Sequence, residues 1–210
     1  MFAIAPRVVV YPFSAAPPVV GEGWIAIAVL ADWAPAVGAG NAREPVFGNG
    51  SHQTTRLCAA AVDLLCRQRP GMSVLDVGTG TGILARVARA RGACFVAGTD
   101  IDPVAVDCAR AHAELDHARD IHFGSEPPDH WGARFDLVVA NILEAPLRSL
   151  APAIGRALLP GGVLLISGFT RPQAPALRLA FETAGLQSTD GFYLDEWVLL
   201  KFGAPHSASR

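Results

Sequence analysis

The sequence predicts an α/β fold, a doubly wound and mostly parallel sheet of seven strands with a short N-terminal extension. Between residues 54 and 185, short apolar runs alternate with segments of helical periodicity, a pattern typical of parallel sheets covered by helices. The stretch S-V-L-D-V-G-T-G-T-G, residues 73–82, ends a strand-like run in three glycines at alternate positions. A chain that turns sharply from strand to helix needs residues that tolerate positive φ, and glycine does.

Length and composition predict one α/β domain with a small additional segment. The chain has 210 residues, of which 51% are apolar and 17% charged, so apolar residues suffice to fill a core. The net charge of −2 provides no basic field, and we expect no direct binding of nucleic acid. The four cysteines are scattered without a C-x-x-C, which argues against a metal site and against a disulfide framework.

The N-terminal extension, residues 1–45, shows no pattern of an export signal or a membrane span. Prolines interrupt its apolar start before a signal-peptide core can form. The apolar run from Trp24 meets Asp32, well short of the roughly 20 residues that a membrane span requires. We therefore expect a cytoplasmic protein without a membrane partner. Residues 7–11 predict a strand, whereas residues 24–31 fit a strand or a helix equally well.

The remaining chain is expected to form one domain, residues 46–202, preceded by a loop at residues 38–41 and followed by a disordered tail, residues 203–210. The expected strands cover residues 73–77, 94–99, 121–123, 135–141, 163–167, 186–193 and 196–202, of which the last two form a hairpin. The expected helices cover residues 54–66, 83–91, 104–119, 147–158 and 174–184.

Cap and turn signals support several of these element ends. Pro70 and Gly71 stop the first helix, and Asp102 is an N-cap with Pro103 at the first helical position. The run Pro160-Gly161-Gly162 ends the helix that precedes the fifth strand.

The glycine turn is typical of a site for a nucleotide-like cofactor at the head of a parallel sheet. Dinucleotide-binding dehydrogenases use G-x-G-x-x-G, whereas this chain has D-x-G-x-G-x-G, with Asp76 before Gly78, Gly80 and Gly82. A carboxylate at this edge of the sheet would repel a pyrophosphate but tolerate a positively charged centre. S-adenosylmethionine has such a centre and no phosphate. We therefore favour it as the cofactor, with a dinucleotide as the alternative.

Two carboxylates follow the second strand of the expected sheet. Asp100 stands where it can accept hydrogen bonds from ribose hydroxyls, a device that NAD enzymes share. Asp102 is expected to cap the next helix, and the alternative is that both residues act only as caps.

The sequence resembles the class I S-adenosylmethionine-dependent methyltransferases, and within them the PrmA type, the methyltransferases of ribosomal protein L11. The resemblance covers roughly residues 45–202 and rests on separated motifs in the family's order. They are V-F-G-N-G-S-H-Q-T-T at 46–55, V-L-D-V-G-T-G-T-G-I-L at 74–84, T-D-I-D-P at 99–103, A-N-I-L-E-A-P-L at 140–147, S-G-F at 167–169 and D-E-W-V at 195–198.

The resemblance adds the loop before the first helix of the domain to the cofactor site. Phe47, next to Gly48, is expected to cover the cofactor and exclude water, and His52 to bind cofactor or substrate or to fix the loop. Thr54 and Thr55 are expected either to cap the helix or to contact the cofactor. The free N–H groups at the start of the helix would favour the carboxylate of the cofactor's methionine part.

The resemblance also singles out Asn141, at the end of the fourth strand, as the residue that accepts a hydrogen bond from a substrate amine. Its position opposite the glycine turn is where α/β enzymes place substrate. Ile101 is expected to pack on the adenine ring, with Gly124 and Ser125 beside it, and Glu144 is a candidate base by position only.

The implied activity is N-methylation of a protein amine, a lysine side chain or a terminal amine, by direct in-line transfer from S-adenosylmethionine. Such a transfer needs alignment and exclusion of water rather than a metal or a covalent intermediate. The PrmA type carries an N-terminal domain for substrate recognition, where this chain has residues 1–45, so we expect that domain to be missing. A small-molecule methyltransferase and a non-catalytic module that binds a cofactor or partner therefore remain alternatives, and the oligomeric state stays open.

Overall fold

The computed structural model describes residues 2–5, 7–12, 18–19, 22, 25–29, 46–131 and 135–206. Among the described residues, seven strands form the central sheet in the order β6-β5-β4-β7-β8-β10-β9. Strand β10 pairs antiparallel with both β8 and β9, and the other neighbouring strands pair in parallel. These strands are β4 (Ser73–Val77), β5 (Phe95–Thr99), β6 (His122–Gly124), β7 (Phe135–Asn141), β8 (Leu158–Thr170), β9 (Gln187–Leu194) and β10 (Trp197–Gly203). The predicted fold class, a doubly wound and mostly parallel seven-stranded sheet, is confirmed.

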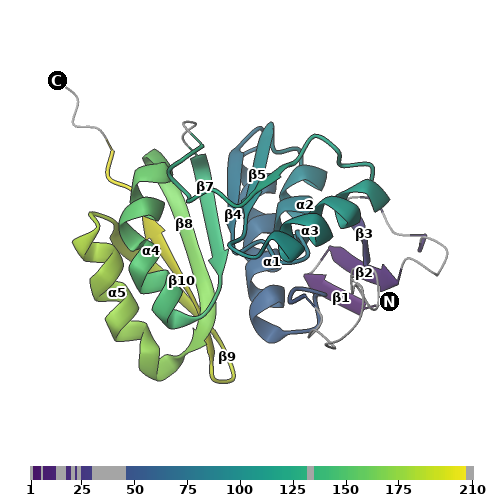
Figure 1. The fold of residues 1–210 in the computed structure, drawn as a ribbon. Helices are drawn as coiled ribbons and strands as arrows, with labels where there is room; N and C mark the ends of the chain where they lie inside the picture. The colour runs from purple at the N-terminus through teal and green to yellow at the C-terminus, as the bar shows by residue number, and fades with distance from the viewer. Residues whose placement is uncertain are drawn as a thin grey trace, which may run out of the picture.

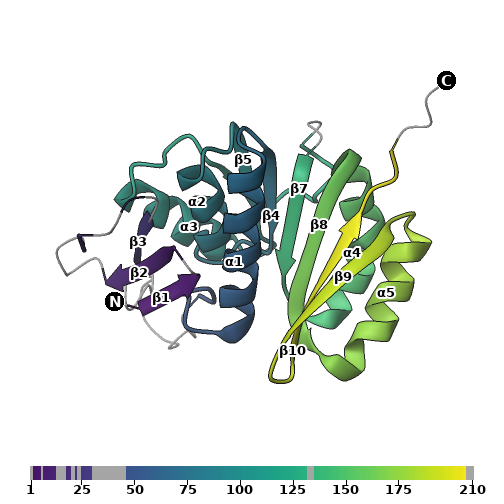
Figure 2. The same ribbon diagram turned by 180° about the vertical axis from the view of Figure 1, so that it is seen from behind.

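Helices cover both faces of this sheet (Figures 1 and 2). They are α1 (Gln53–Gln68), α2 (Ile83–Ala90), α3 (Pro103–Leu115), α4 (Glu144–Ala157), a short 3₁₀ turn η1 (Arg171–Gln173) and α5 (Ala174–Thr183). One core lies between the sheet and α1 to α3, and the second lies between the sheet and α4 and α5. Alternate residues of β4 serve the two cores, since Val74 joins the first and Leu75 the second.

The connectivity creates a switch point between β4 and β7. From β4 the chain moves outward to β5 and β6, and it then returns to place β7 on the other side of β4. The carboxyl ends of β4 and β7 therefore lie side by side, with Val77 paired to Ala140. Ligands of open α/β sheets bind in the crevice at such a point.

A second, three-stranded sheet lies against α1, α2 and α3 (Figure 2). It consists of β1 (Phe2–Ala5), β2 (Val8–Pro12) and β3 (Ile25–Val29), with β1 antiparallel and β3 parallel to β2. The segment that fitted a strand or a helix is thus the strand β3. The loop expected at residues 38–41 lies outside the described residues.

Several element ends differ from the prediction. Helix α3 ends at Leu115, because His117 adopts the left-handed conformation (φ 56°). Helix α4 begins at Glu144, since Pro146 falls in the first turn, where no helical N–H is required. The Pro160-Gly161-Gly162 run, expected to end the preceding helix, lies within β8 instead. The register of β8 against β7 shifts around this run, because Phe135 pairs with Leu158 and Leu137 with Val163.

The C-terminal end of the sheet extends beyond its expected limit. Gly203 is the last residue of β10, and Ala204 exchanges backbone hydrogen bonds with Gly161 and Gly162. The expectation of a disordered tail thus does not hold for residues 203–204, and residues 207–210 lie outside the described part of the chain.

Candidate functional site

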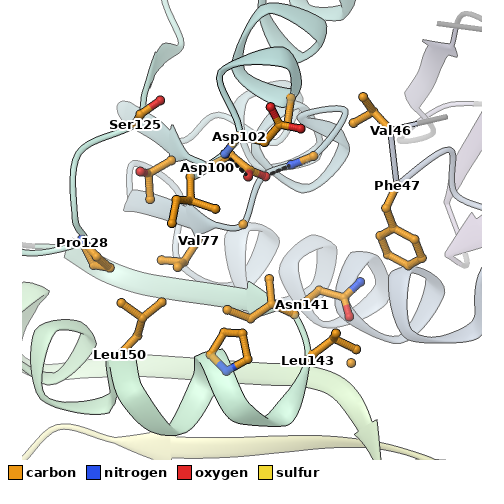
Figure 3. A pocket seen from close by; sticks show the side chains of 18 of the residues that line it. Val46, Phe47, Val77, Asp100, Asp102, Ser125, Pro128, Asn141, Leu143 and Leu150 are labelled. Atoms are coloured by element: carbon orange, nitrogen blue, oxygen red, sulfur yellow. Dashed lines mark hydrogen bonds between the residues drawn. The ribbon is translucent and has the colours of Figure 1, made fainter. Parts of the chain in front are cut away.

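A cavity of about 1430 Å³ opens at the switch point, above the carboxyl ends of β4, β5 and β7 (Figure 3). Phe47 and Asn141 lie on one side of it, and Pro128 and Leu150 on the other. The cavity thus lies where the sheet topology predicts a ligand.

The glycine turn after β4 forms one edge of the cavity. The amides of Gly78 and Thr79 both donate to the carbonyl of Thr99 at the end of β5, at 2.7 and 3.0 Å. Gly80 adopts φ +53°, and a Cβ there would lie 2.3 Å from the carbonyl oxygen of Phe47. Position 80 therefore requires glycine for two reasons, its conformation and the close approach of a second backbone.

Asp76 lies beneath the turn rather than in the cavity lining. It is 1% exposed, and its Oδ2 accepts hydrogen bonds from the Thr79 hydroxyl at 2.7 Å and the Ala85 amide at 3.3 Å. Its Oδ1 is buried without a protein partner. Burial raises the pKa of this carboxyl to about 7, although both hydrogen bonds act in the opposite direction. Asp76, expected as a cofactor contact, thus fixes the turn to the start of α2.

Asp100 occupies the position that the sequence predicts, at the edge of the cavity beside the glycine turn. Its Oδ2 accepts from the Gly80 amide at 3.0 Å and its Oδ1 from the Asp102 amide at 3.1 Å. Figure 3 shows these contacts as dashed lines. Each oxygen keeps a free lone pair, so the carboxylate can still accept hydrogen bonds from a ligand. Asp102 caps α3 through the amide of Val104, as expected.

The loop at residues 46–50 and the start of α1 form a second wall, next to the glycine turn. The N-cap of α1 is His52, whose Nδ1 lies 3.3 Å from the Thr54 amide and 2.8 Å from the Thr54 hydroxyl. The expectation that Thr54 or Thr55 caps this helix is therefore corrected, because the helix begins one residue earlier, at Gln53. The His52 ring meets the Phe47 ring edge-on, at 5.4 Å between centroids.

Asn141 is the last residue of β7 and is 9% exposed at the floor of the cavity. Its Nδ2 donates to the Thr55 hydroxyl at 3.4 Å, while its Oδ1 is buried without a protein partner. A buried acceptor without a partner is costly unless a ligand supplies a donor. The Asn141 side chain is therefore suited to receive an N–H from a bound molecule.

The structure brings nine of the predicted site residues together around the cavity: Phe47, His52, Thr54, Gly78, Gly80, Asp100, Ile101, Ser125 and Asn141. Ile101 is almost fully exposed there. Gly48, Thr55, Asp76 and Gly82 are not part of the lining and instead contact residues next to it. Glu144, the candidate base, is also absent from the lining and forms an ion pair with Arg148 at 3.3 Å.

Several lining residues were not predicted from the sequence, and Trp197 is the most informative of them. Its indole meets the His52 ring at 4.7 Å between centroids, although it lies at the start of β10. The D-E-W-V motif pointed to this position without indicating its role. Leu143, Leu150 and Pro128 also belong to the apolar lining. Leu143 falls within the A-N-I-L-E-A-P-L motif, whereas no motif covers Leu150 or Pro128.

Among the described residues, no three His, Cys, Asp or Glu side chains gather into a group that could hold a metal ion. None of the described helices is long and apolar enough to cross a membrane.

The sheet order and the glycine turn after β4 define the fold of the class I S-adenosylmethionine-dependent methyltransferases. Residues 44–204 match the family described as "Ribosomal protein L11 methyltransferase (PrmA)", and the chain belongs to this family.

Individual proteins agree with this assignment. Two relatives are named ribosomal protein L11 methyltransferase. The one from Caulobacter sp. (strain K31) is 37% identical to this chain over 163 residues, and the one from Dechloromonas aromatica (strain RCB) is 43% identical over 155 residues. These alignments cover 76% and 73% of this chain, and 57% and 50% of the relatives. The chain thus spans about half the length of the curated relatives it matches.

Solved structures show the same fold. The ribosomal protein L11 methylase from Lactobacillus delbrueckii subsp. bulgaricus superposes with a TM-score of 0.81 at 26% identity, covering 97% of each chain. The N-methyltransferase NodS from Bradyrhizobium japonicum WM9, solved in complex with S-adenosyl-L-homocysteine, shares the fold at a TM-score of 0.59 and 16% identity, over 74% of this chain and 90% of its own.

Proposed function

We propose that this chain is an S-adenosylmethionine-dependent methyltransferase that N-methylates a protein amine, a lysine side chain or a terminal amine, by direct in-line transfer. The observation that carries the proposal is the pairing of two acceptors across one cavity. The Asp100 carboxylate lies beside the glycine turn, and the unpartnered Asn141 Oδ1 lies at the end of the neighbouring strand. The Asp100 carboxylate can accept hydrogen bonds from ribose hydroxyls, and the Asn141 Oδ1 can accept one from an amine N–H.

The lining suits this cofactor better than a dinucleotide. The described residues that line the cavity include three carboxylates, Asp100, Asp102 and Glu126, but neither lysine nor arginine. A pyrophosphate would meet negative charge there without a cationic partner. The apolar lining, which includes Ile101 and Pro128, fits an adenine ring.

When bound, S-adenosylmethionine would supply a methyl group on a sulfonium. Its transfer to the lone pair of a neutral amine would form the N–C bond as the S–C bond breaks, leaving S-adenosylhomocysteine and releasing one proton from the amine to solvent. The Asn141 Oδ1 accepts an N–H of the substrate amine and so orients its lone pair, while the Thr55 hydroxyl fixes the side-chain amide. Phe47 and Trp197 provide apolar walls that exclude water.

The acceptor that we propose is an amine of ribosomal protein L11, the protein after which these relatives are named. We further propose that residues 46–202 form the catalytic domain. A ribosomal substrate supports a cytoplasmic location for the protein. The test is transfer of a labelled methyl group from S-adenosylmethionine to purified ribosomal protein L11, to total protein and to a small-metabolite fraction. Label in protein supports the proposal, and label confined to metabolites contradicts it.

A further inference from the structure

A single residue, Thr81, joins the glycine turn to the loop at residues 46–50. Its backbone N–H donates to the carbonyl of Phe47 at 3.1 Å, and its hydroxyl donates to the carbonyl of Gly48 at 2.6 Å. Thr81 is 4% exposed, so water does not compete for these bonds. Two consecutive carbonyls of the loop are thus fixed by one residue of the turn.

The close approach of the two segments is built from both sides. A Cβ at Gly80 would collide with the Phe47 carbonyl at 2.3 Å. On the loop side, Gly48 adopts φ +109°, and a Cβ there would lie 3.0 Å from the Thr81 hydroxyl. Glycine therefore stands at both positions where the backbones meet, and the Thr81 side chain occupies the space between them.

The residue held in this way carries a wall of the cavity. The Phe47 side chain is 52% exposed, lines the cavity and meets no aromatic partner other than His52 among the described residues. Figure 3 shows its ring at the side of the pocket next to Asn141. Because half of the ring is exposed, its own packing holds it weakly, and the position of Phe47 depends on its backbone.

We infer that Thr81 is a positioning residue that couples the cofactor-binding turn to the Phe47 wall through its hydroxyl bond to the Gly48 carbonyl. This inference rests on the proposed function, since it assumes that the cavity receives the cofactor. Thr81 itself is not part of the lining, so it acts through Phe47.

The test compares Thr81→Val with Thr81→Ser. Valine keeps the shape and the backbone N–H but removes the hydroxyl donor, whereas serine retains it. We expect Thr81→Val to weaken binding of S-adenosylhomocysteine about 3- to 10-fold, as the loss of one hydrogen bond does. Thr81→Ser is expected to bind within about 2-fold of the wild type. Hydrogen exchange of the amides at residues 46–50 should be faster in Thr81→Val only.

A double-mutant cycle separates positioning from a general loss of stability. If Thr81 acts through Phe47, then Thr81→Val should change the affinity less than about 2-fold in a Phe47→Ala background. Thr183→Val is the matched control, because the Thr183 hydroxyl donates to the Leu179 carbonyl at 2.7 Å on α5, far from the turn. It should leave both the affinity and the exchange at residues 46–50 unchanged.

A second variant tests the same contact from the loop. Gly48→Ala leaves the turn intact but pushes against the Thr81 hydroxyl, and it should reproduce the faster exchange and the weaker binding. Wild-type affinity and exchange in both Thr81→Val and Gly48→Ala, or additive effects in the cycle, would overturn the inference. Absence of S-adenosylhomocysteine binding by the wild type contradicts the proposed function instead, and the exchange measurement then still tests the contact.

Discussion

The carboxylate of Asp100 accepts a hydrogen bond from the amide of Gly80 at 3.0 Å. This contact joins the end of β5 to the turn after β4, two strands that lie side by side in the sheet. The residue proposed to bind the ribose is therefore fixed against the backbone that the cofactor approaches. The sheet thus holds both Asp100 and the glycine turn in position without a ligand.

Replacement of Asp100 by alanine should weaken S-adenosylhomocysteine binding about 10- to 100-fold, because it removes charge-assisted hydrogen bonds to the ligand and to the turn. Isothermal titration calorimetry measures this change. Asp107→Ala is the matched control: it removes an exposed ion pair with Arg110 on α3, outside the cavity lining, and should leave stability and affinity nearly unchanged. Equal affinities of wild type and Asp100→Ala would refute the ribose assignment.

Alanine at Gly80 should abolish cofactor binding, because its Cβ would lie 2.3 Å from the Phe47 carbonyl at a left-handed φ. Gly92 also has a positive φ, +84°, but a Cβ there meets nothing within 4 Å. Gly92→Ala should therefore cost only about 1 kcal/mol of unfolding free energy and keep the affinity. If the two variants bind equally well, the turn does not contact the cofactor.

Truncation of Asn141 to alanine should lower kcat about 100-fold or more, since it removes the acceptor that orients the amine. The affinity for S-adenosylhomocysteine should change only a few-fold. Single-turnover methylation assays with the purified acceptor, together with calorimetry, separate the two quantities. A variant with weakened cofactor binding and unchanged kcat would place Asn141 in cofactor binding alone.

Asp76→Asn should change how stability depends on pH. The folded-state pKa of Asp76 is raised from 3.8 to about 7 by burial, so the folded protein retains a proton that the unfolded chain releases. The wild type must then lose stability as pH rises from about 4 to 7, by up to roughly 1.4 kcal/mol per pH unit from this group. Asparagine retains an oxygen for Thr79 and Ala85 but does not titrate. Urea unfolding across this pH range should show a smaller fall in the variant, and parallel profiles would contradict the expectation.

The small N-terminal sheet is held to the domain by the buried Arg86 on α2. Its Nε donates to Asp116 at 2.7 Å, and both residues bind the main chain of Ala28 in β3. Arg86→Met leaves Asp116 without its partner and should lower the unfolding free energy by about 3 kcal/mol. The exposed Arg89–Asp120 pair, at 2.7 Å, is the control, and Arg89→Met should cost under about 1 kcal/mol. Equal losses in urea unfolding would rule out this docking role.

The fold was predictable because its signals are local. Alternating apolar runs and helical periodicity give the order of strands and helices, and Asp102 with Pro103 marks the start of α3 correctly. The error at residues 160–162 lies where long-range contacts decide. Leu158 and Val163 on either side of this run pair with β7, and Gly161 and Gly162 bond to Ala204, so the run stays in a strand, although the same residues usually end a helix.

The site was predictable to the extent that its residues follow strands of the parallel sheet. Asp100 follows β5 and Asn141 ends β7, the two strands on either side of β4, so their meeting at the cavity follows from topology. The burial of Asp76 could not be predicted from the sequence. Its hydrogen bonds to Thr79 and Ala85 beneath the turn were therefore not expected. Trp197 reaches the cavity because β10 pairs with β8, a long-range pairing that the predicted hairpin did not include.

The most direct test of the central claim is calorimetric titration of the full chain with S-adenosylhomocysteine and, separately, with NAD. We predict one S-adenosylhomocysteine bound per chain, loss of that binding in Gly80→Ala, and no binding of NAD. Binding of NAD in preference to S-adenosylhomocysteine, or no binding of S-adenosylhomocysteine by the wild type, would contradict the claim that this cavity holds a methyl donor.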